Sequence, residues 1–132
     1  MEVQGLNHVN IVAGDLQRTI AFYESVLGMT AQTIPNLPAG LEGRWLCDVN
    51  GEPIIHLVAH NPARHGDLEA RDATTGSIDH VALACADFDG MLRRCKELGL
   101  AHRVNDRRIG SLRQVFVTDP DNVVLELNFA AD

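Results

Sequence analysis

Apolar and polar positions follow two different periods along the opening of the chain. In residues 8–13 they alternate, which predicts a β-strand with one apolar face and one polar face. In residues 16–27 the apolar side chains recur every three or four positions, which predicts an α-helix. Asp15 precedes this helix as a candidate N-cap, and Gly28 follows it where a C-cap needs a left-handed residue. The opening therefore predicts a strand followed by a helix.

The same succession of periods returns later in the chain. Residues 80–85 alternate again, and residues 88–98 show helical spacing. Asp87 and Gly99 occupy the two capping positions. The two segments align at an offset of 72 residues. We interpret this correspondence as an internal repeat.

The second part of each copy is a strand entered through a turn. Residues 50–58 align with residues 120–128 at an offset of 70. Asn50–Gly51 is a hairpin signal, and Asp119–Asn122 is a turn with Pro in its second position. Each copy therefore predicts a module made of a strand, a helix and further strands.

The two modules are predicted to share one domain that spans residues 1–132. The first covers about residues 1–60 and the second about residues 77–132. Residues 61–76 between them are polar and rich in helix breakers, which favours a connector.

Four side chains of metal-ligand type fall at duplicated strand positions. Because side chains alternate across a strand, each of the four faces away from the apolar positions that pack beneath a helix. They are His8, His56, His80 and Glu126. Three imidazoles and one carboxylate suit a borderline divalent ion such as Zn, Ni, Co, Fe(II) or Mn. The repeat therefore predicts a metal site that suits a substrate developing negative charge on oxygen.

Charge and composition exclude several classes of partner. The net charge is −7 and the isoelectric point about 5.2, which argues against nucleic acid and anionic membranes. No apolar run approaches the roughly 18 to 20 residues that span a bilayer, and the first residues do not resemble a signal peptide. The three cysteines lack CxxC spacing. We therefore expect a cytoplasmic protein with reduced thiols.

Three stretches carry a resemblance to a known family. The segments "HVNIVAGDLQRTIAFYESVLGM", "HVALACADFDGM" and "FVTDPDNVVLEL" resemble the vicinal oxygen chelate superfamily, and glyoxalase I-like members in particular. The resemblance implies an α+β fold in which two βαβββ modules form a cup-shaped, eight-stranded mixed sheet around one metal. It places the ligands at His8, His56, His80 and Glu126, and it implies a homodimer.

Several reactions are compatible with this resemblance. The leading hypothesis is a metal-dependent lyase or isomerase of the glyoxalase I type, which acts on a small substrate with two adjacent oxygens through a metal-stabilised enediolate. Glu126 or His56 would move the proton. Glyoxalase I-type enzymes usually carry Glu or Gln where His56 stands, so His56 is either a fourth ligand or an acid/base. One alternative is an Fe(II) or Mn(II) extradiol dioxygenase; another is an antibiotic-modifying or drug-binding resistance protein.

Candidate substrate-binding residues surround the predicted cup. Asn10 and Asn128 share its polar face and either bind substrate or serve the scaffold. Trp45 either lines the mouth of the cup or fills the core. The cationic segment 102–114 contains Arg103, Arg107 and Arg108, which either clamp an anionic substrate or lie in a solvated loop.

Overall fold

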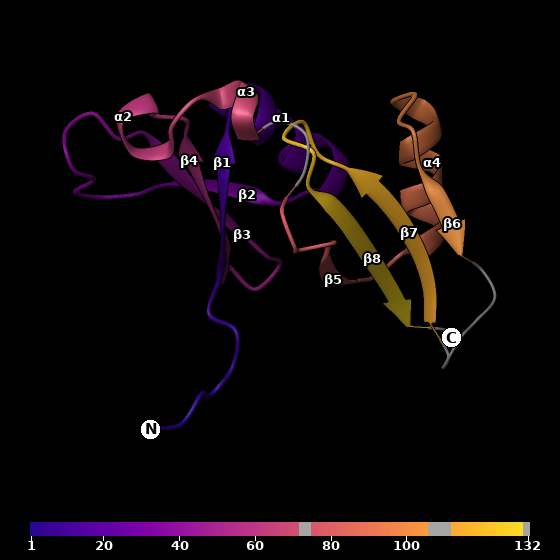
Figure 1. The fold of residues 1–132 in the computed structure, drawn as a ribbon. Helices are drawn as coiled ribbons and strands as arrows, with labels where there is room; N and C mark the ends of the chain where they lie inside the picture. Colours follow the sequence, from indigo (N-terminus) through magenta and orange to yellow (C-terminus); the bar gives the residue numbers. More distant parts are fainter. Residues whose placement is uncertain (72–74, 106–111, 131–132) are drawn as a thin grey trace. The chain divides into compact units, whose positions relative to one another are not determined.

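The structure of the protein is a computed structural model, and it describes residues 1–71, 75–105 and 112–130. The chain divides into two compact units, residues 1–68 and residues 69–132 (Figure 1). Each unit contains one four-stranded mixed sheet. No helix in the described ranges combines the length and apolar character needed to cross a bilayer.

The first unit has a strand, a helix and three strands in chain order. These are β1 (Val9–Ala13), α1 (Leu16–Leu27), β2 (Thr30–Thr33), β3 (Gly43–Cys47) and β4 (Pro53–Ala59). The strands lie in the order β1-β4-β3-β2, with β1 and β4 parallel and the other pairs antiparallel. The first and last strands of the unit are therefore neighbours.

The second unit repeats this arrangement. Its elements are β5 (Val81–Cys85), α4 (Phe88–Glu97), β6 (Arg103–Asn105), β7 (Leu112–Thr118) and β8 (Val124–Ala130). The strand order is β5-β8-β7-β6, again with the first and last strands parallel. Two short helices, α2 (Pro62–His65) and α3 (Leu68–Arg71), lie between β4 and β5 in the chain. The predicted α+β fold of paired βαβββ modules is thus confirmed.

The predicted N-caps of α1 and α4 and the predicted C-cap of α1 are present. The Asp15 carboxylate accepts a hydrogen bond from the backbone N–H of Arg18 at 3.1 Å, and Gly28 adopts φ 65° at the other end of α1. Asp87 accepts from the N–H of Gly90 at 2.9 Å at the start of α4. Each acceptor satisfies an N–H that the first helical turn leaves without a partner.

The helical spacing predicted one residue too many at the end of α4. Leu98 was expected on its packing face, but α4 ends at Glu97 and Leu98 is half exposed. Leu98 occupies the C-cap, and Gly99 turns the chain away in the left-handed region with φ 59°.

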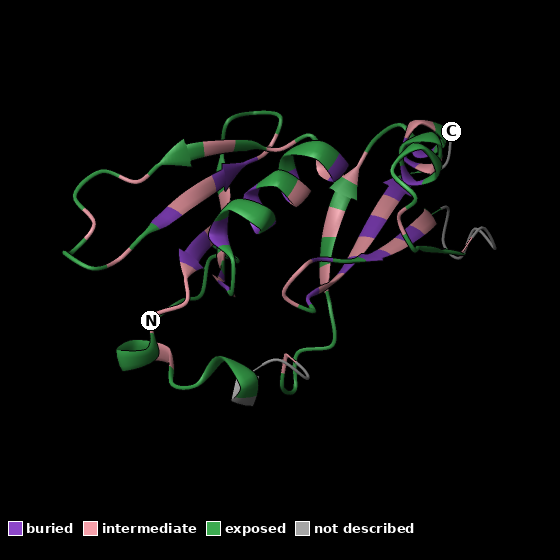
Figure 2. Cartoon of the chain, turned by 90° about the horizontal axis from the view of Figure 1, so that it is seen from above, coloured by how far each residue is buried: buried purple, intermediate pink, exposed green. Residues whose placement is uncertain are grey.

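Burial alternates along β8 and from Ile54 to Leu57 in β4, as the parity argument requires (Figure 2). In β4 Ile55 and Leu57 are at most 1% exposed, whereas His56 between them is only half-buried. In β8 Leu125 and Leu127 are fully buried, and Glu126 between them is half-buried. Each sheet therefore has an apolar face and an opposite face on which the ligand-type side chains lie.

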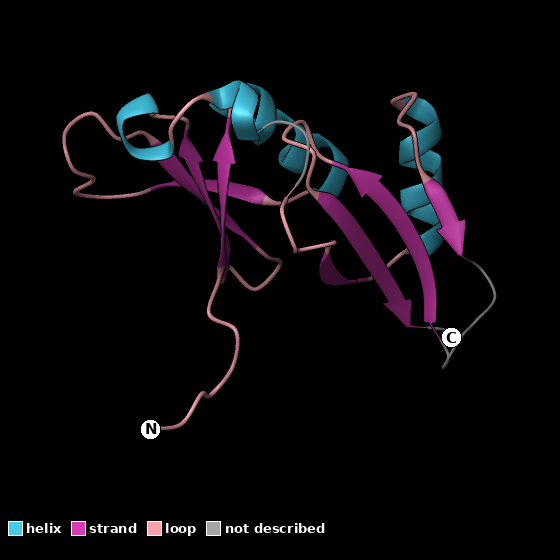
Figure 3. Cartoon of the chain, in the orientation of Figure 1, coloured by secondary structure: helices cyan, strands magenta, loops and turns pink. Residues whose placement is uncertain are grey.

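Each β-hairpin that leads into a last strand is closed by an aspartate. Oδ1 of Asp48 accepts from the N–H groups of Asn50 and Glu52, both at 2.9 Å. Oδ1 of Asp119 accepts from the N–H groups of Asp121 at 2.8 Å and Val123 at 2.9 Å. These turns join the antiparallel strands seen in Figure 3, β3 to β4 and β7 to β8, and so help to fix their register.

Candidate metal centre

Two histidines stand in the same position, one residue before the first strand of each unit. Nδ1 of His8 lies 2.6 Å from Oδ1 of Asn7, and Nδ1 of His80 lies 2.8 Å from Oδ2 of Asp79. Because an amide or carboxylate oxygen only accepts, Nδ1–H is the donor in both pairs. The neighbouring residue therefore holds each imidazole through Nδ1.

His56 lies in β4 between side chains of two adjacent strands. Asn10 of β1 and Trp45 of β3 are its direct partners in the sheet register. Nδ2 of Asn10 lies 2.8 Å from Nδ1 of His56, and the Trp45 ring centroid lies 4.7 Å from that of the imidazole. The His8 ring is 6.1 Å from His56 and meets Trp45 edge-on at 5.0 Å. The first unit thus brings His8, His56, Asn10 and Trp45 together.

Nε2 of His56 is buried without a hydrogen-bond partner in the described part of the chain. It lies 3.5 Å from the point that a Cβ on Gly43 would occupy, and that Cβ would meet the Leu57 carbonyl oxygen at 2.5 Å. Gly43 therefore allows β3 to approach β4 beside the ring. A buried polar atom without a partner is costly and calls for an explanation such as an ion.

The surroundings of His56 favour the neutral form of its ring. Burial is the main cause that lowers its pKa, and the positive charges of His8 and Arg64 add to it. With Asn10 donating from Nδ2, the ring proton lies on Nε2. If the amide of Asn10 turns over, its Oδ1 accepts from Nδ1–H and the lone pair is left on Nε2.

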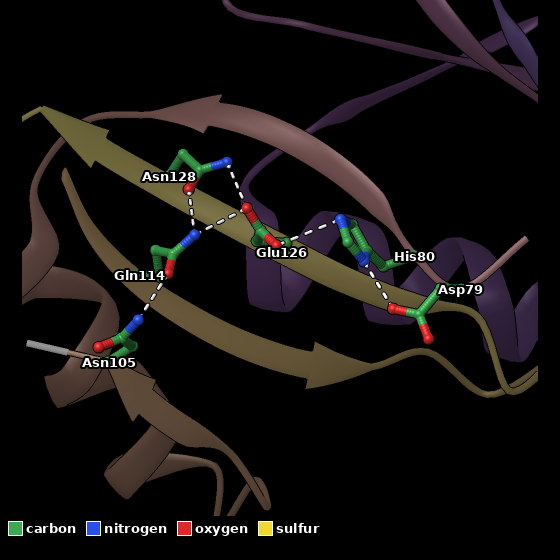
Figure 4. A network of polar contacts seen from close by, with 6 residues as sticks. All are labelled: Asp79, His80, Asn105, Gln114, Glu126 and Asn128. Atoms are coloured by element: carbon green, nitrogen blue, oxygen red, sulfur yellow. Dashed lines mark hydrogen bonds and ion pairs between the residues drawn. The ribbon is translucent and has the colours of Figure 1, made fainter. Parts of the chain in front are cut away.

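Glu126 lies at the centre of a polar network in the second unit (Figure 4). Its Oε1 accepts from Nε2 of Gln114 at 2.8 Å and from Nδ2 of Asn128 at 2.9 Å. Its Oε2 lies 3.2 Å from Nε2 of His80. One carboxylate oxygen is thus occupied by amides, and the other faces the imidazole.

The network fixes both amides that contact Glu126. Gln114 also donates to Oδ1 of Asn128 at 3.0 Å and accepts from Nδ2 of Asn105 at 2.8 Å. Asn128 was predicted to bind substrate or serve the scaffold, and both ends of its amide are engaged within this network. These contacts favour a scaffold role for Asn128 over substrate binding.

The surroundings of His80 favour the protonated form of its ring. The hydrogen bond to Asp79 is the largest cause that raises the pKa of His80; burial opposes it, and the charges of Glu126 and Asp79 add to the rise. An imidazole binds a metal only in its neutral form. A cation can therefore bind Nε2 of His80 only after that nitrogen has lost its proton.

A pH titration of the metal-free protein tests this assignment. We expect the imidazole C–H signals of His80 in NMR spectra to titrate above pH 6.5, the ordinary histidine value of about 6.5 being the reference. Asp79→Asn removes the charge and weakens the hydrogen bond, so the midpoint should fall in this variant. An unchanged His80 midpoint would contradict the assignment.

The four predicted ligands share one feature that suits a cation. Asn7, Asn10 and Asp79 hold the three imidazoles at Nδ1, and amides hold Glu126 at Oε1. The remaining atoms are three Nε2 and one Oε2, a donor set that borderline divalent metals accept once the amide of Asn10 presents Oδ1 to the His56 ring. His8 and His56 lie in the first unit and His80 and Glu126 in the second, and within the described ranges no three such side chains form a cluster.

The predicted cationic residues have different surroundings. Arg103 on β6 stacks over the Phe116 ring, with Cζ 4.0 Å from its centroid, and Phe116 pairs with Glu126 across β7 and β8. Arg103 and Phe116 line an open hollow of about 360 Å³ together with Ala101, His102, Val117, Thr118 and Val124. Arg107 and Arg108 lie outside the described residues.

The residues that orient the ligands were missed by sequence reasoning. Gln114 and Asn105 fall on the same face as Glu126 by strand parity, so alternation along residues 112–118 could have suggested Gln114. Asn7 and Asp79 were also available as a signal, because each directly precedes a predicted ligand in the repeat. Residues that are adjacent in the chain are close enough for the contacts of Asn7 with His8 and of Asp79 with His80.

Comparison with known proteins agrees with this fold. Residues 5–127 match the model of the Glyoxalase/Bleomycin resistance protein/Dioxygenase superfamily. The chain belongs to this superfamily, so the resemblance noted in the sequence is confirmed.

Individual relatives are distant. A metallothiol transferase FosB from Lysinibacillus sphaericus is 30% identical over 97% of this chain and 84% of its own length. Glyoxylase I 4 from Arabidopsis thaliana is 25% identical over 96% of this chain and 71% of its own length. A mutant of the fosfomycin resistance protein FosX from Listeria monocytogenes, solved with Mn(II) and 1S,2S-dihydroxypropylphosphonic acid, superposes with a TM-score of 0.71 at 19% identity, covering 98% of this chain and 95% of that one. At this identity the structural match supports the fold alone.

Proposed function

We propose that this protein is a metal-dependent lyase or isomerase of the glyoxalase I type, acting on a small molecule with two adjacent oxygen atoms. One observation carries the proposal: in each of the four ligand candidates, hydrogen bonds hold one polar atom of the side chain and leave the other for a metal. Each histidine is held through Nδ1, and Glu126 is held through Oε1. Such partners set the tautomer and orientation of metal-binding side chains.

His8 and His80 would hold the cation through Nε2, and Glu126 would hold it through Oε2. His56 would be the fourth ligand through its buried Nε2, once the amide of Asn10 presents Oδ1 to Nδ1–H. A bound divalent ion supplies Lewis acidity that polarises the two substrate oxygens.

The protein's own groups would carry the proton. Within the described ranges the amide donors of Glu126 contact Oε1, so Oε2, once substrate has displaced it from the cation, would be the oxygen that takes a proton from a substrate carbon and returns it to the neighbouring carbon. Trp45 covers the ring of His56 and would keep water from that side of the site.

Arg103 would recognise an anionic group of the substrate. Its Cζ lies 4.0 Å from the centre of the Phe116 ring, and both residues line the hollow, where the guanidinium N–H groups would donate to a carboxylate or phosphonate. The preferred substrates are therefore adducts that carry a negative charge at a distance from the reacting oxygens.

Metal analysis and a substrate comparison test this function together. Protein purified without chelators should contain one nickel, cobalt, zinc or manganese per chain. It should consume hemithioacetals of methylglyoxal, measured by ultraviolet absorbance, and should use adducts of anionic thiols better than those of 2-mercaptoethanol. Arg103→Gln should raise KM for the anionic adducts only. Absence of metal overturns the proposal, and iron with O₂ uptake on catechols replaces it with ring cleavage.

A second candidate is metal-dependent transfer of a thiol to a small phosphonate. The FosB relative, which is called a metallothiol transferase, supports it, because it matches 97% of this chain at 30% identity. His8, His80 and Glu126 would again hold the cation, with Arg103 available to the phosphonate. Loss of free thiol with fosfomycin, without turnover of hemithioacetals, would favour this candidate over the first.

A further inference from the structure

The amides beside Glu126 form a directed chain. Asn105 donates to Gln114, and Gln114 donates to Glu126 and Asn128 through the same nitrogen. Because Asn105 occupies the carbonyl oxygen of Gln114, that amide cannot turn over without losing its bond. Its N–H₂ group is therefore committed to Oε1 of Glu126 (Figure 4).

The corresponding positions of the first unit lack this chain. Gln114 pairs with Asn128 in the register of β7 and β8, whereas Gly43 pairs with Val58 in the register of β3 and β4. His56 instead takes its hydrogen bond from Asn10 on the parallel strand. Ala82 has the place of Asn10 beside Glu126 and can donate nothing from its side chain. The amides thus belong specifically to the half of the site that holds the carboxylate.

We propose that Gln114 is a positioning residue that decides which oxygen of Glu126 acts. With Oε1 occupied by Gln114 and Asn128, Glu126 would use Oε2 to bind a cation, and would use the same oxygen to exchange a proton when it is released from the cation. Asn105 supports this role by fixing the amide of Gln114. The inference rests on the proposed function, since it assigns the carboxylate to a metal.

Gln114→Met is the central test, because methionine has a similar shape and no donor. We expect the affinity for Mn(II) in calorimetric titrations to fall by roughly 10- to 100-fold, as for other partners that orient a metal ligand. The visible spectrum of the Co(II)-loaded variant should also change, since a released carboxylate can bind through both oxygens. Gln17→Met, at an exposed position of α1, is the matched control and should leave both measurements unchanged.

A measurement without metal separates this inference from the function on which it rests. In NMR spectra of the metal-free protein, the carboxyl carbon of Glu126 and the side-chain amide of Asn128 should shift in Gln114→Met and stay unchanged in Gln17→Met. Unchanged signals, or wild-type metal affinity in Gln114→Met, overturn the role of Gln114. A wild-type protein that binds no divalent metal, but in which those signals do shift, overturns the metal function while the hydrogen bond stands.

Discussion

Glu126→Gln should abolish tight metal binding without unfolding the protein. The carbonyl oxygen of the new amide can take over the bonds from Gln114 and Asn128, so the network keeps its shape. Its N–H₂ group then stands where Oε2 faces Nε2 of His80, and a donor replaces the charged ligand atom. We expect affinity for Mn(II) to fall by more than the roughly 100-fold upper range seen when only an orienting partner is lost.

Calorimetric titration of the purified variant measures this loss, and circular dichroism checks the fold. Glu24→Gln, at an exposed position of α1, is the matched control that should bind like the wild type. Retained affinity in Glu126→Gln would remove Glu126 from the ligand set. The three imidazoles would then be the remaining predicted ligands.

Asp119→Ala should have the largest effect on stability. Asp119 is 4% exposed, and its Oδ1 accepts two backbone N–H groups in the turn before β8. We expect the free energy of unfolding to fall by about 2 to 4 kcal/mol, because a hydrogen bond to a charged group contributes roughly 1.5 to 3 kcal/mol and the abandoned donors are shielded from water. Urea denaturation followed by circular dichroism measures the change.

Two further variants serve as controls for Asp119→Ala. Asp119→Asn keeps an acceptor in the turn and should cost less than Asp119→Ala. Asp48→Ala removes the same pair of bonds from the turn before β4, but Asp48 is only half-buried, so water can replace the carboxylate there. A loss in Asp48→Ala that equals the loss in Asp119→Ala would show that burial is not the cause.

Sequence periodicity predicted the parts of the fold that depend on local geometry. Strand alternation placed Ile55 and Leu57 on the buried face and His56 on the other, and helical spacing with Asp15 and Gly28 gave the bounds of α1. These features follow from periods of 2 and 3.6 residues and from capping chemistry. Leu98 was misplaced because spacing alone cannot tell the last turn of a helix from its cap.

The contacts that orient the ligands could not be predicted in the same way. Gln114 reaches Glu126 only because β7 and β8 pair in one register, with Phe116 opposite Glu126. A shift of one residue would send Gln114 to the other face of the sheet. The pairing of Asn10 with His56 depends likewise on the parallel register of β1 and β4. Parity gives the face of a side chain, and register gives its partner.

The parallel pairing of the first and last strands of each unit has a thermodynamic consequence. Val9 meets Ile55 and Val81 meets Leu125 only in the folded chain, so the members of each ligand pair lie far apart in the unfolded ensemble. A cation held by these groups would bind the native state and not the unfolded chain. By mass action it would add about 2.7 kcal/mol to the unfolding free energy at a free concentration of 100 times Kd. The supply of metal would thus help to set how long the protein persists in the cell.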